Sequence, residues 1–135
     1  MDEYIASAKA HWAPRFTANG VPAVDFERVT KDLQSWDEWC AAFSKGAELY
    51  EEMGAQSLAK KHFKSAGAHY STAAAFYHFA KFVFVRHYEE MKVAHMNAVR
   101  CRNIAIKYIE FPGERVEIPF ENSKMVGILR KPSGE

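Results

Sequence analysis

The chain has 135 residues and a mass of 15.4 kDa, which is the size of one domain or slightly more. Its 18 Lys and Arg nearly balance its 17 Asp and Glu, so bulk charge is not expected to hold it to nucleic acid or to an anionic membrane. With 48% hydrophobic residues it should be globular, and its two cysteines are too few for a disulfide scaffold.

The N-terminal quarter of the chain predicts two short helices. Its opening sequence, MDEYIASAKA, lacks the apolar segment of a signal peptide, which together with the few cysteines favours a cytoplasmic protein. A first helix over residues 2–12 is expected to stop before Pro14, and Asn19-Gly20-Val21-Pro22 is typical of a loop. The apolar residues within 25–33 share one helical face, so a second short helix is expected there.

Two longer helices are predicted next. Ser35 and Glu38 have the spacing of a capping box, in which each side chain accepts a hydrogen bond from a free backbone N–H. The amphipathic helix that follows is expected to end at Gly54. Another helix should begin near Ser57, and its segment 65–80 contains no Asp, Glu, Lys or Arg. A helix that is apolar on all sides usually lies at the centre of a fold.

A third long helix is predicted over residues 88–109. Its inner stripe of apolar and small side chains is interrupted only by Arg102. The stripe consists of Met91, Ala94, His95, Ala98, Arg102, Ala105 and Ile109. The most apolar window of the chain, residues 65–85, contains histidines and Lys81 and is too polar for a membrane span.

The period of the pattern changes from helical to alternating after residues 111–113. Apolar and polar residues alternate over residues 115–120, and the apolar run Met125–Leu129 follows Glu121-Asn122-Ser123-Lys124. This pattern predicts a β-hairpin with Phe120 opposite Met125. Pro119 cannot donate to a ladder, so the first strand should lie at a sheet edge. The second strand has a free edge, and an isolated hairpin is marginal in water. We therefore expect that a larger sheet follows Glu135 in a longer protein.

Histidine and cysteine spacing gives no metal motif. The six histidines form no HxxxH, HExxH or Glu-x-x-His, the two cysteines form no CxxC, and no glycine-rich phosphate loop occurs. We expect neither a metal nor another cofactor. The candidates for a small-molecule pocket are Phe76, Tyr77 and His78, because Tyr77 and His78 place polar groups among apolar ones. Aromatic runs of this kind are more often core.

One helical hairpin has tetratricopeptide-like spacing. The matching positions are Phe43, Ala47, Tyr50, Gly54, Ala59, Phe63 and Ala66. Shifted by about 34 residues, the pattern fails at Lys81, and a stable array needs about three repeats. A stand-alone helical interaction module without catalysis is therefore the alternative interpretation, and a ligand-binding protein that uses Tyr77 and His78 ranks third.

Four segments in the second half of the chain occur in a familiar order. They are AFYHFAKFVF (75–84), Ala94-His95 with Ala98-Val99, FPGERVEIPF (111–120) and GILRKP (127–132). In this order they resemble the N-terminal part of a branch of the α/β-hydrolase superfamily. That branch includes 2,6-dihydropseudooxynicotine hydrolase and fungal polyketide-shortening hydrolases. The resemblance covers about half the chain well and residues 1–70 loosely.

The resemblance implies a mainly α-helical cap of antiparallel helices over residues 1–110. It also implies the first β-hairpin of an α/β-hydrolase catalytic domain over residues 111–135, the rest of that domain being absent. A serine with a histidine base would cleave a C–C bond next to a ketone, or an ester, in a small-molecule substrate. These catalytic groups would follow Glu135, so no catalytic residue is assigned here and the chain alone is expected to be inactive. A cap of this kind shapes the substrate pocket, excludes water and can form a homodimer contact.

Overall fold

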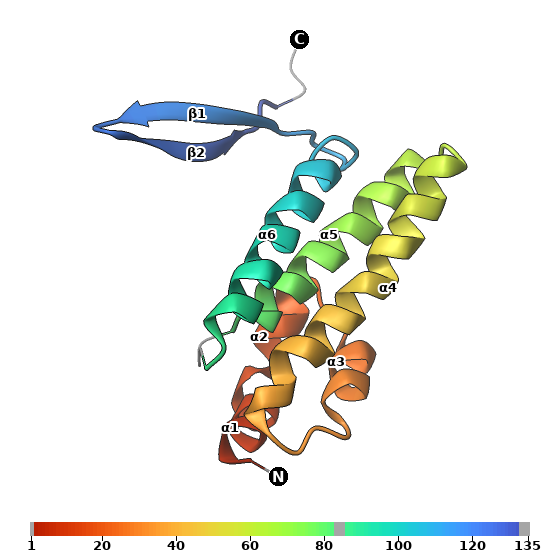
Figure 1. The fold of residues 1–135 in the computed structure, drawn as a ribbon. Helices are drawn as coiled ribbons and strands as arrows, with labels where there is room; N and C mark the ends of the chain where they lie inside the picture. Colours follow the sequence, from red (N-terminus) through yellow and green to blue (C-terminus); the bar gives the residue numbers. More distant parts are fainter. Residues whose placement is uncertain (1, 83–85, 133–135) are drawn as a thin grey trace.

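The computed structural model describes residues 2–82 and 86–132 (Figure 1). Within them, three long helices lie side by side and antiparallel, with α5 between α4 and α6. Short helices gather at one end of the long ones, and a β-hairpin extends from the other end. The helices are α1 (Glu3–Ser7), α2 (Ala13–Ala18), α3 (Ala23–Thr30), α4 (Trp39–Ala59), α5 (Phe63–Ala80) and α6 (Tyr88–Ala105). The strands are β1 (Glu114–Phe120) and β2 (Ser123–Leu129). The predicted fold class, a helical unit followed by a hairpin, is confirmed.

The N-terminal helical stretch continues past Pro14. α1 leads through a π-helical segment, Ala8–Trp12, into α2. The prediction that the helix stops before Pro14 is therefore wrong. Pro14 occupies the first turn of α2, where a missing N–H leaves no hydrogen bond unmade.

The loop at residues 19–22 is confirmed, and Gly20 has a φ of 102° there, a conformation that favours glycine. α3 ends at Thr30, earlier than the predicted helix over 25–33. Phe26 and Leu33 are both buried as the pattern indicated, but Leu33 reaches the core from the segment after the helix.

Ser35 and Glu38 both cap the start of the next helical segment, as predicted. The Ser35 hydroxyl accepts from the Asp37 N–H at 3.2 Å, and the Glu38 carboxylate accepts from the Gln34 N–H at 3.1 Å. The partners differ by one residue from those of a regular capping box. The cause is a tight 3₁₀ turn over Trp36–Glu38 that precedes α4.

Gly54 does not end α4. The helix continues to Ala59, and α5 begins at Phe63 rather than near Ser57. The ring of Tyr70 on α5 lies against Gly54, so that a Cβ there would come within 2.8 Å of the ring. Gly54 therefore serves the close approach of two helices, and the chain turns instead at Lys61, whose φ is 60°.

The position of α5 at the centre of the fold is confirmed. Its buried residues pack against both neighbouring long helices. Phe79 stacks on Phe16 with ring centroids 3.9 Å apart, and its carbonyl accepts a hydrogen bond from the Trp39 indole at 2.9 Å. These contacts join α5 to α2 and α4, so the stretch without charges has become an aromatic core.

α6 is shorter than predicted and ends at Ala105. Its buried side chains are Ala94, Ala98, Cys101 and Ala105. His95, which the stripe placed inside, is exposed, and Arg102 is half-buried.

The hairpin forms with a register that differs from the predicted one. Phe120 pairs with Ser123 rather than Met125, and Ile118 pairs with Met125. The turn is therefore only Glu121-Asn122, with Glu121 at a φ of 49°, as tight hairpin turns require. A shift of two residues preserves which side chains share a face. The apolar face carries Val116, Ile118, Phe120, Met125 and Leu129.

Candidate ligand-binding site

An open hollow of about 480 Å³ lies between α5, α6 and β2. Ala74 and Ala75 on α5 and Ala98 on α6 line it, and their small side chains leave space between the helices. Val126 and Ile128 line it from β2. These two residues alternate with the outward-facing apolar residues of the same strand, so the hairpin presents one face to the hollow and one away from it.

Among the described residues, the ionisable groups that line the hollow are all basic. They are His78, Lys81, His95 and Arg102, and none of the described lining residues is Asp or Glu. The Lys81 ammonium lies 2.9 Å from His95 Nδ1, so it donates to that nitrogen when the imidazole is neutral. Burial lowers the pKa of His78, and the charges of Lys81 and His95 lower it further. His78 is therefore mainly uncharged at neutral pH.

Arg102 extends from α6 to this hollow. Burial lowers its pKa, and the positive charge of Arg130 adds to the effect. Within the described part of the chain, Arg102 forms no ion pair with a carboxylate. Glu117 is on the hairpin face that carries Val126, but it is already paired with both Arg115 and Lys124. The described residues of the hollow thus offer cationic hydrogen-bond donors and no carboxylate acceptor.

The three residues predicted to line a pocket lie in different surroundings. His78 lines the hollow. Phe76 is fully buried between α5 and α4, where its ring packs against Phe43 and Tyr50. Tyr77 is also buried, and its hydroxyl donates to Glu51 on α4 at 3.3 Å. Neither Phe76 nor Tyr77 lines the hollow, so the helix turns these two candidates towards the core.

Glu51 on α4 is the centre of a polar network that joins α4, α5 and α6. Arg100 on α6 binds both of its oxygens at 2.7 Å, and the Cys101 thiol lies 3.5 Å from one of them. The hydrogen bonds from Arg100 lower the pKa of Glu51, and burial opposes them. Burial, with the charge of Glu51, raises the pKa of Cys101 to about 12. This protonated, buried thiol is a structural group rather than a nucleophile.

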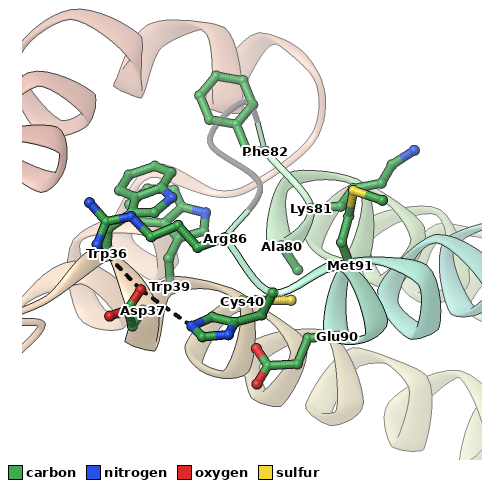
Figure 2. A pocket seen from close by; sticks show the side chains of 11 residues that line it. Trp36, Asp37, Trp39, Cys40, Ala80, Lys81, Phe82, Arg86, Glu90 and Met91 are labelled. Atoms are coloured by element: carbon green, nitrogen blue, oxygen red, sulfur yellow. Dashed lines mark hydrogen bonds and ion pairs between the residues drawn. The ribbon is translucent and has the colours of Figure 1, made fainter.

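A second cavity, beside the start of α4, is too small for a ligand (Figure 2). Its volume is about 30 Å³, which holds roughly two water molecules. Asp37 pairs there with Arg86 at 3.3 Å (Figure 2). His87 Nε2 lies 3.3 Å from the same oxygen of Asp37. Trp36 and Trp39 lie beside this cluster. These contacts link the residues just before α6 to the turn before α4.

Sequence reasoning did not assign Lys81, His95 and Arg102 to a site. One signal was available, because His95, Ala98, Val99 and Arg102 recur at helical spacing and Arg102 was the single charge in an apolar stripe. The hairpin residues that line the hollow carried no such signal. The predicted strand pairing placed them on one face of the hairpin without indicating what that face contacts.

In the ranges 2–82 and 86–132, no group of three or more His, Cys, Asp or Glu side chains is placed to hold a metal ion. No helix in these ranges is both long and apolar enough to cross a membrane.

No protein-family model matches the chain, and no curated protein matches it. Among solved structures, it is similar to the crystal structure of the 2,6-dihydroxy-pseudo-oxynicotine hydrolase, with a TM-score of 0.79 and 24% sequence identity. The match covers 93% of this chain and 34% of the hydrolase chain, so this chain spans about a third of that protein's length. At this identity the likeness shows the fold. The resemblance to this hydrolase that the motifs in residues 75–132 indicate is therefore confirmed at the level of the fold.

Proposed function

We propose that this chain is the cap region of a hydrolase that cleaves a C–C bond or an ester in a carbonyl-containing small molecule. The serine nucleophile, its histidine base and the oxyanion donors would lie outside these 135 residues. The observation that carries the proposal is the fold shared with a hydrolase over 93% of the chain. Two free thiols suit a cytoplasmic enzyme.

The exposed face of the hairpin supports a larger catalytic sheet. Ile118, Phe120, Met125 and Leu129 are each between 43% and 52% exposed, although they share one face. A two-stranded hairpin is marginal by itself, and such a face gains stability when further strands or helices cover it. We therefore assign residues 111–135 to a catalytic domain and residues 1–110 to its cap.

The hollow supports a substrate-facing role for the cap. His78 lines it, and we assign this residue to substrate contact. Phe76 and Tyr77 lie behind it, and we assign them to holding α5 against α4. A cap in this arrangement would exclude water from the reacting carbonyl.

The test is to sequence the native gene past codon 135 and to assay its complete product. We expect a third strand, an oxyanion loop and a Gly-x-Ser-x-Gly elbow. The product should hydrolyse an aryl ester or a 1,3-diketone, and a serine-to-alanine variant of the elbow is the control.

The 135-residue chain alone should be inactive in the same assay. A native stop codon directly after Glu135, or serine-dependent hydrolysis by the 135-residue chain, would refute the proposal. The first of these results would favour the alternative of a helical interaction module.

A further inference from the structure

We propose that the hollow between α5, α6 and β2 binds a small carboxylate with an apolar body, such as an aromatic acid. The assignment deepens the proposed function by giving the charge of the substrate, and to that extent it rests on it. The binding itself needs only residues of this chain.

The unbalanced charge of the hollow is the first argument. Lys81 and Arg102 line it, and Arg130 is close enough to lower the pKa of Arg102. No Asp or Glu within residues 2–82 and 86–132 lines it. Arg100, two residues before Arg102 on the same helix, instead has both terminal nitrogens on the Glu51 carboxylate. A half-buried guanidinium without a counter-ion is costly. A carboxylate from outside would supply the missing acceptor and can bind the guanidinium through two parallel hydrogen bonds.

The shape and apolar walls of the hollow are the second argument. Its volume of about 480 Å³ lies within the usual range for small-molecule pockets, roughly 300–1,000 Å³. The alanines of α5 and α6 form its floor, and Val99, Val126 and Ile128 are each at least 39% exposed around it. An apolar body would remove these side chains from water, which favours binding in proportion to the area covered.

The polar groups of the hollow suit orientation rather than catalysis. Ser71 and Asn103 line it from facing helices and offer one hydroxyl and one amide. Lys81, which contacts His95, provides one cationic group in the hollow, and Arg102 provides another. A ligand that places its carboxylate on a cationic position would lay its apolar part against the alanine floor.

The test compares 1-naphthoate with the neutral 1-naphthylmethanol as probes of the 135-residue chain, by calorimetry and by NMR shifts. The naphthoate should bind at least about tenfold more tightly, since a hydrogen bond to a charged group is involved. Shifts should be largest at Ala74, Ala98 and Val126. Raising the salt concentration should weaken naphthoate binding and leave the neutral probe unaffected.

The variant Arg102→Gln should weaken naphthoate binding by about tenfold or more and leave naphthylmethanol binding unchanged. Lys92→Gln is the matched control, because it removes a cation from an exposed position on α6 outside the hollow. If Arg102→Gln does not fold, as judged by circular dichroism, Lys81→Gln takes its place with the same expected direction.

Equal binding of the two probes, an unchanged ratio in Arg102→Gln, or shifts confined to Ile118 and Phe120 would overturn the assignment. Loss of binding in a longer gene product, with binding intact in the 135-residue chain, would also overturn it and indicate an acidic protein segment as the occupant. Naphthoate binding without hydrolase activity in the complete product would refute only the proposed function. Activity without binding would refute only this inference.

Discussion

Replacing Glu51 with alanine is expected to destabilise the three-helix core more than any other single removal of an ion pair described here. Glu51 on α4 accepts hydrogen bonds from Tyr77 on α5 and from Arg100 on α6. Its side chain is 26% exposed, whereas that of Arg100 is 46% exposed. One carboxylate therefore joins all three long helices at a partly buried point.

The expected loss of stability in Glu51→Ala can be estimated from the two partners of Glu51, Tyr77 and Arg100. Without Glu51, the buried Tyr77 hydroxyl lacks its acceptor, which costs about 1–3 kcal/mol. The pair with the half-exposed Arg100 adds at most about 1 kcal/mol, because solvent screens it. The free energy of unfolding should therefore fall by about 1–4 kcal/mol in total. Glu51→Gln keeps an oxygen for Tyr77 and should lose about 1 kcal/mol.

The stabilisation that Glu51 contributes should depend on pH in a definite direction. Arg100 holds the pKa of Glu51 below its usual value of 4.5 in the folded chain. The stabilisation is therefore present in full above pH 4.5 and is lost as the pH falls through the lower, folded-state pKa. The difference in stability between wild type and Glu51→Ala should shrink over that range.

Urea unfolding followed by circular dichroism measures these changes, at neutral pH and at acidic pH. Glu117→Ala is the matched control, because Glu117 also binds two cations but does so on the exposed hairpin. It should leave the unfolding midpoint unchanged. A double-mutant cycle with Tyr77→Phe should show coupling between positions 51 and 77. The reasoning is refuted if Glu51→Ala unfolds at the same urea concentration as the wild type or if the cycle shows no coupling.

Three further predictions concern other parts of the chain. Gly67→Ala should lower the free energy of unfolding by about 1–3 kcal/mol, because the new Cβ would lie 2.8 Å from the Tyr108 backbone. This loss should outweigh the higher helix propensity of alanine. A variant that is more stable than the wild type in urea unfolding would contradict this prediction. Ile118→Lys should reduce self-association of the chain through the exposed hairpin face, measured by light scattering across concentrations, and a wild type that stays monomeric at all concentrations would argue against it. Cys40 should react with a disulfide reagent at pH 8 before Cys101, because Cys101 is buried and burial raises its pKa to about 12. Equal reaction rates of the two thiols in the folded chain would contradict this and show that Cys101 is accessible.

Part of the candidate site could be predicted from the sequence. His78 was singled out and lines the hollow, and Arg102 stood out as the single charge in the inner stripe of its helix. The contact of Lys81 with His95 was not predicted, because it joins the end of α5 to the middle of α6. Nothing in the sequence indicated that His78 lines the hollow while Phe76 and Tyr77 lie in the core. Which of three consecutive residues faces a cavity depends on how the helix is rotated against its neighbours.

The sequence by itself determined the type and order of the main elements. Segments without charge become buried helices, and alternation assigns each hairpin residue to a face, because both patterns report which side chains leave water. The tertiary structure alone decided where these elements end and how they meet. The sequence pattern predicts a helix end at Gly54, but the Tyr70 ring packs against Gly54 and the helix continues past it. The hairpin register depends on a two-residue turn at Glu121-Asn122. The hollow exists only because β2 lies near the alanines of α5 and α6. Such contacts join residues far apart in the chain, and local periodicity carries no information about them.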